Sequence, residues 1–203
     1  MAVPRFTLAE LDLDFELRGR DWLPVITTAV PVGTTTGADV VVPQGDARRV
    51  LRAVVRLVAD LPRDSTPDVV WTSGRSELLV HTDTISLTCT VGLLRVAIAV
   101  ECDQTGGRTT ISVPFAVGTP QAATGLVMQT YDRLDGPAAV TAVWADALTA
   151  FCWEALLETA TRLCAEIGND SRGRALVPGS IGSGSRVLLL RPMARHDARL
   201  RPA

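Results

Sequence analysis

The chain has 203 residues, 47% of them hydrophobic and 21% charged, which predicts a globular protein and excludes an intrinsically disordered one. Its net charge of −2, with arginine supplying every basic residue, excludes a strong overall attraction to nucleic acid or acidic membranes but leaves a local basic face possible. This length fits one domain with a sizeable core.

Residues 1–37 are predicted to be N-terminal strands. Leu11 to Leu17 alternates leucine and phenylalanine with aspartate and glutamate, as in a strand with an acidic outer face. Trp22 to Val32 is a second extended segment, interrupted by two prolines. The acidic residues before Leu23 rule out the apolar segment of a signal peptide, and the longest apolar run is far too short to span a membrane. We therefore expect a cytoplasmic protein with no membrane partner.

The next stretch predicts a strand followed by an amphipathic helix. Ala38 to Val42 is a β-branched run that ends at Pro43. From Ala47 to Leu61 valine and leucine recur at helical spacing, which predicts one buried stripe. Pro62 and the polar residues after it end this helix.

Arginines gather on the opposite face of that helix, with Arg48, Arg52 and Arg56 in one row. Guanidinium groups match the geometry of phosphates, so the row is a candidate nucleic-acid-binding site. The alternative is a solvated face that pairs with Asp60 and with the acidic residues of a second helix. The sequence leaves both interpretations open.

The region from Val69 to Val117 predicts an antiparallel meander. Thr84 to Val91 alternates polar and apolar residues, as a half-buried strand does. Short polar or glycine-containing segments separate the strands. The predicted strands are Val69–Trp71, Glu77–His81, Thr84–Val91, Leu94–Glu101 and Thr109–Val117.

A connector with one possible short helix, Gln121 to Leu134, leads to a helix of about thirty residues, 138–167. The apolar residues of this long helix change side near its middle, so it either bends or is covered on two sides. A helix with two apolar faces often lies between its own sheet and a partner subunit. Trp153 and Leu157 are therefore the candidate interface residues of a homo-oligomer or of a complex with a protein partner.

The C-terminal part predicts one more strand. The segment Gly179 to Ser185 is glycine- and serine-rich; it lacks the ending and the following helix of a phosphate-binding loop, so we expect a flexible turn. Arg186 to Leu190 predicts the last strand, and 196–203 a disordered tail. The whole span 38–195 is expected to be a single α+β core domain.

Residues that could carry chemistry are few. The two histidines, His81 and His196, are far apart in the sequence, and no nucleophile motif accompanies them. The four cysteines lack metal-ligand spacing and lie in apolar patterns, so we expect buried free thiols. We predict no catalytic residues, no metal and no cofactor.

The predicted fold is α+β: an antiparallel sheet of about six to eight strands with two main helices packed on it. The stretches ADVVVPQGDARRVLRAVVRLVADL and PDVVWTSGRSELLVHTDTISLTCTV, with the closing RVLLLRPMAR, resemble a DNA sliding-clamp domain. The resemblance implies helices that line a ring and present basic residues to DNA. It would place Arg48, Arg52 and Arg56 at the pore.

The sequence thus favours a non-catalytic interaction or assembly protein, with a clamp-like fold and an arginine-lined helix that could contact nucleic acid. The alternative is a small-molecule-binding protein. In that case the long helix would cross a curved sheet and leave an apolar cavity lined by Trp71, Trp144 and Phe151. An enzyme using the same cavity is a third possibility that no residue pattern favours.

Overall fold

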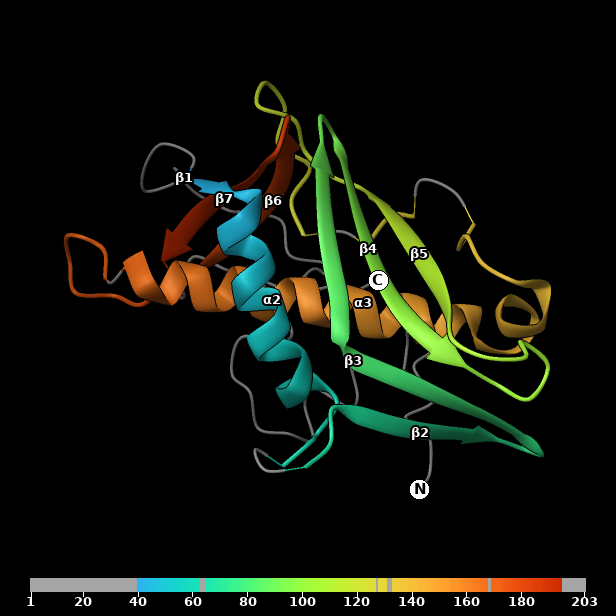
Figure 1. Ribbon diagram of the computed structural model, residues 1–203. Helices are drawn as coiled ribbons and strands as arrows, with labels where there is room; N and C mark the ends of the chain where they lie inside the picture. The colour runs from blue at the N-terminus through green and yellow to red at the C-terminus, as the bar shows by residue number, and fades with distance from the viewer. Residues whose placement is uncertain (1–39, 63–64, 127, 131–132, 168, 195–203) are drawn as a thin grey trace.

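The computed structural model describes residues 40–62, 65–126, 128–130, 133–167 and 169–194. The predictions for 1–37 and 196–203 concern residues outside these ranges. Within them the fold is α+β, as predicted, with two helices and seven strands in two antiparallel sheets (Figure 1). The elements are β1 (Val40–Pro43), α2 (Gln44–Val58), β2 (Asp68–Ser73), β3 (Ser76–Thr90), β4 (Leu93–Glu101), β5 (Thr109–Ala116), α3 (Ala138–Ile167), β6 (Leu176–Gly184) and β7 (Val187–Ala194).

The larger sheet is the predicted meander, with the strand order β2-β3-β4-β5. Glycines with positive φ make its first two turns, Gly74 at 61° and Gly92 at 72°. The sequence predicted two strands, Glu77–His81 and Thr84–Val91, where the structure has the single strand β3. A register shift between His81 and Ser86 absorbs the polar residues between them, so the chain bends without leaving the sheet.

The smaller sheet has the order β1-β7-β6, so the first described strand pairs with the last. The glycine-rich segment predicted to be a flexible turn is part of β6, and this prediction is wrong. Its glycines are required by close packing: a Cβ on Gly182 would lie 2.9 Å from the main-chain oxygen of Gly118. Gly118 and Gly182 form a parallel bridge that links the smaller sheet to the end of the larger one.

Helix α3 runs through the middle of the molecule, and in Figure 1 it passes behind α2 and the larger sheet. All residues from 150 to 160 are buried, which explains why its apolar side chains occupy more than one face. The helix is long and apolar enough to cross a membrane by composition, with a mean hydropathy of 1.3 over 18 residues, but 61% of that window is buried inside the protein. A core helix meets the same criterion.

Helix α2 begins at Gln44, earlier than predicted, because the N–H of Gln44 finds a partner in the main-chain oxygen of Arg186. It ends at Val58, before Pro62, since Asp60 adopts a positive φ of 55°. Most of the predicted apolar stripe is buried, namely Leu51, Val54, Val55 and Val58, together with Ala47. Val50 and Leu61, the first and last members of the stripe, are half-buried.

The connector between β5 and α3 is not helical in its described residues, so the short helix expected at 121–134 is not formed there. Its polar main-chain groups extend the larger sheet instead. The N–H of Ala116 donates to the oxygen of Gln129 at 2.7 Å, and Ser112 and Asp135 form an antiparallel bridge. The outer edge of β5 is thereby covered by the connector.

Candidate functional site

The arginine row of α2 lies along the edge of β3. Alternate main-chain oxygens of a strand point to the same edge. Arg48 Nη2 donates to the oxygen of Leu87 at 2.9 Å, and Arg52 Nε donates to the oxygen of Ile85 at 3.2 Å. The helix therefore satisfies strand acceptors through its side chains, along a stretch of β3 that β2 does not pair with.

Two hydrogen bonds made by the main chain of Cys89 continue this contact at the end of β3. The N–H of Cys89 donates to the side-chain oxygen of Gln44 at 2.8 Å, and its carbonyl accepts from the N–H of Arg186 at 3.1 Å. Arg186 has a positive φ of 62° in the turn between β6 and β7. The start of α2, the end of β3 and the β6–β7 turn thus meet at one junction, which joins the two sheets.

Arg56, the third predicted member of the row, lies beyond this edge. Its Nη2 donates to the main-chain oxygens of Pro62 at 2.7 Å and Ser65 at 2.9 Å. All three predicted nucleic-acid-binding residues therefore bind main-chain oxygens. These contacts differ from the ion pairs with Asp60 or with acids of the second helix that the solvated-face alternative assumed.

Arg52 has a second feature that bears on binding. The residue is exposed, and its terminal nitrogens, unlike its Nε, have no hydrogen-bond partner among the described residues. The bond from Nε holds the guanidinium in place while its outer N–H groups point away from the anchor. Arg49, one turn earlier, pairs with Asp46 and is 80% exposed. A small basic surface therefore remains on α2.

The three predicted cavity residues are brought together, but by direct contact. The Trp71 ring from β2 meets Phe151 edge-on with the ring centroids 5.2 Å apart, and Trp144 at 6.3 Å. Each of the three side chains is buried. At these distances the rings themselves fill the space between the strand and α3.

The two predicted interface residues, Trp153 and Leu157, lie inside the chain. Trp153 is 1% exposed and packs on Phe115 of β5, with ring centroids 5.3 Å apart, and Leu157 is fully buried. The second apolar face of α3 is therefore covered by the same chain. A partner subunit would find neither side chain at the surface.

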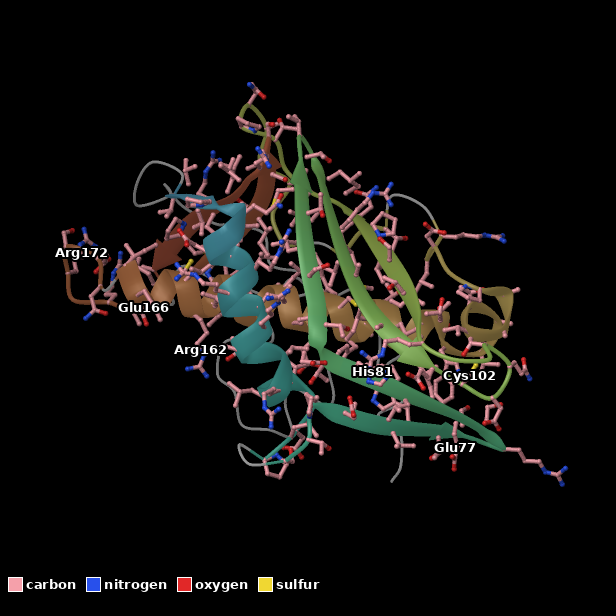
Figure 2. All side chains as sticks on the ribbon, in the orientation of Figure 1. Glu77, His81, Cys102, Arg162, Glu166 and Arg172 are labelled. Carbon is pink, nitrogen blue, oxygen red and sulfur yellow. The ribbon has the colours of Figure 1, made fainter. Side chains whose placement is uncertain are left out.

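Sequence reasoning missed a charged cluster around His81 (Figure 2). The imidazole side chain is 3% exposed, with Nδ1 2.7 Å from Oδ1 of Asp68 and Nε2 3.1 Å from Oε1 of Glu101. Arg108 joins the cluster with Nη2 3.2 Å from His81 Nδ1 and Nε 3.4 Å from the same Glu101 oxygen. The only signal in the sequence was a histidine inside a strand pattern. Its partners lie on β2, on β4 and in the turn between β4 and β5, so only the strand register brings them to His81.

The geometry at His81 limits its chemistry. A general base needs a ring nitrogen that can face a substrate, and here both nitrogens face side chains of the protein. A metal cannot take this ring as a ligand without displacing a carboxylate. Across the parts of the chain that the structure covers, no group of three His, Cys, Asp or Glu side chains is arranged to hold a metal ion. What the cluster does is tie strands β2, β3 and β4 together.

The cysteines are free thiols, three of them buried as predicted, whereas Cys102 is only half-buried. Desolvation raises the pKa of Cys89 to about 11, although Ser183 and Arg48 act in the opposite direction, and raises the pKa of Cys164 to about 12. Burial also raises the pKa of Cys152. These three thiols stay protonated at neutral pH and are poor nucleophiles.

We expect one fast-reacting thiol out of four. At pH 8 a thiol reagent should label Cys102, the only partly exposed cysteine, well before the other three, because only the thiolate reacts and the others are buried. Labelling in denaturant, where all four should react at similar rates, is the control. Two or more fast thiols in the native protein would show that the core around α3 opens readily.

No family model, curated protein or solved structure matches this chain. The function must therefore be argued from the residues themselves.

Proposed function

We propose that this protein acts by binding an anionic macromolecule, such as the phosphate backbone of DNA, rather than by catalysis. The observation that supports this most is Arg52, an exposed arginine whose Nε is fixed by a main-chain oxygen. A guanidinium held in place in the free protein loses less conformational entropy on binding a phosphate. Its outer N–H groups have the fork geometry that phosphate oxygens accept.

Two neighbours support the same surface. Arg49 is one turn away on α2 and is largely exposed, while Arg48 is held beside it by the oxygen of Leu87. Arginines on one helix face contact backbone phosphates and make no hydrogen bonds to bases, so we expect binding without sequence preference. The net charge of −2 limits the attraction to this local surface.

The side chains with potential reactivity also favour binding over catalysis. Both ring nitrogens of His81 face carboxylates, and three of the four thiols are buried. Self-assembly and a clamp-like arrangement remain part of the proposal. Their support is the order strand, helix, four strands, helix, two strands, with both helices packed against each other.

The test is a salt titration of binding to duplex DNA, followed by fluorescence anisotropy. Replacing Arg52 by glutamine should weaken binding and lower the slope of log Kobs against log salt by about 1, as expected for the loss of one phosphate contact. Arg75→Gln is the matched control, because Arg75 is exposed at the β2–β3 turn, away from α2, and makes the same change in charge.

Light scattering at low and high salt then measures assembly against the chain mass of 21.6 kDa. A salt-sensitive DNA complex that Arg52→Gln weakens and Arg75→Gln leaves intact supports the proposal. If the wild-type protein does not bind DNA at low salt, or if the two variants bind DNA equally well, α2 is not the binding surface.

A further inference from the structure

The cluster around His81 contains two groups that make opposite demands on one nitrogen. Oδ1 of Asp68 lies 2.7 Å from Nδ1 and can only accept a hydrogen bond when the carboxylate is charged. Nη2 of Arg108 lies 3.2 Å from the same Nδ1 and can only donate. A single nitrogen cannot serve both, because it either carries a proton or offers a lone pair.

The charged imidazole satisfies one set of contacts. With both nitrogens protonated, Nδ1–H donates to Asp68 of β2 and Nε2–H donates to Glu101 of β4. Arg108, from the turn between β4 and β5, then pairs with Glu101. In this arrangement β2 and β4 are both bonded to the ring that β3 carries between them.

The neutral imidazole satisfies a different set. One proton remains, and on Nε2 it keeps the bond to Glu101, while the lone pair on Nδ1 accepts from Arg108. Asp68 would then face a lone pair at 2.7 Å, which is repulsive. Its side chain is 37% exposed, so it can turn to water instead.

We propose that Asp68 and Arg108 compete for Nδ1 of His81, so that one proton decides whether the start of β2 is held against β3. When Nδ1 is protonated it donates a hydrogen bond to Asp68. When it has lost the proton it accepts a hydrogen bond from Arg108, and Asp68 is released. Asp68 is the first residue of β2 and pairs with His81 in the register. The release of Asp68 therefore loosens the first residue of β2, next to the hydrogen bond that the N–H of Thr82 donates to the oxygen of Pro67.

The proton can be followed by nitrogen NMR of the imidazole in a His196→Gln background, where His81 is the only histidine. When the ring loses its proton we expect a change from two N–H groups to an Nε2–H tautomer whose Nδ1 accepts a hydrogen bond. Asp68→Asn should lose the Nδ1 proton at lower pH than the parent, because the carboxylate that stabilises the cation is gone. Arg108→Gln should keep it to higher pH. Asp103→Asn, a neighbouring exposed charge in the same turn, is the control for a general electrostatic effect.

Amide hydrogen exchange measures the structural consequence. After correction for the intrinsic pH dependence, the amide of Val69 should exchange about tenfold faster once His81 is neutral, since a charge-assisted hydrogen bond at the strand end is lost. Asp68→Asn should remove this pH dependence. Opposite shifts of the proton in the two variants support the proposal and cannot arise from loosening alone. Shifts in the same direction, shifts no larger than in Asp103→Asn, or exchange that does not follow the proton would overturn it.

Discussion

Replacing Trp153 by alanine is expected to lower the free energy of unfolding by about 3–5 kcal/mol, as large-to-small changes at buried aromatic residues do. The side chain is 1% exposed, lies in the fully buried middle of α3 and packs on Phe115. Its removal would leave a cavity between the helix and β5 that rigid neighbours fill only in part. Urea unfolding followed by far-ultraviolet circular dichroism measures the loss.

Trp153→Phe is the matched variant. The indole Nε1 of Trp153 is buried and has no hydrogen-bond partner among the described residues. Phenylalanine keeps a ring against Phe115 and removes a donor whose burial without a partner costs about 1–3 kcal/mol, which offsets the lost ring volume. We expect unfolding within about 1 kcal/mol of the parent. Equal losses for both variants would show that the ring contact is not what stabilises α3.

Gly182→Ala should destabilise the protein strongly, with a loss of about 2–3 kcal/mol in the free energy of unfolding from overpacking. The added Cβ would lie 2.9 Å from the main-chain oxygen of Gly118 and 3.4 Å from Cβ of Leu189. The Gly118 contact is backbone, so it cannot rotate away as a side chain would. The bond from the N–H of Ser183 to the oxygen of Gly118, 2.8 Å long, would be strained with it. Thermal or urea unfolding measures the effect.

Gly45→Ala is the control with the opposite sign. Gly45 is exposed in the first turn of α2, and a Cβ there meets nothing within 4 Å. Alanine should raise the stability by up to about 1 kcal/mol, because it loses less backbone entropy than glycine in a helix. Destabilisation by both variants to the same extent would contradict the packing argument at Gly182.

The sequence predicted the elements whose signal is local. The period of Val50 to Val58 identified α2, the breaker-free run identified α3, and the alternation of Thr84 to Val91 identified the second half of β3. These patterns depend on which face of an element is buried, and that is written in the order of its own residues. The α+β class followed from them.

What failed depends on contacts between distant residues. Glycines in β6 suggested a turn because the sequence does not show that Gly118 crosses them. The arginines of α2 suggested either a phosphate-binding row or a solvated face paired with acidic residues, because the sequence does not show the edge of β3 beside them. Asp68, Glu101 and Arg108 could not be assigned to His81 without the strand register.

The pairing of β1 with β7 has a consequence for how the protein folds. Val40 and Leu190 are register partners, so the smaller sheet closes between two ends of the described chain. Closing so long a loop costs conformational entropy before any stabilising contact forms, so we expect the pairing of β1 with β7 to be a late and slow step in folding. During synthesis the larger sheet can form while β7 is still inside the ribosome, whereas β1 must wait without its partner. The edge of β3 at Cys89 would also stay open in that interval, because the turn that covers it belongs to the β6–β7 hairpin, which is synthesised after the larger sheet.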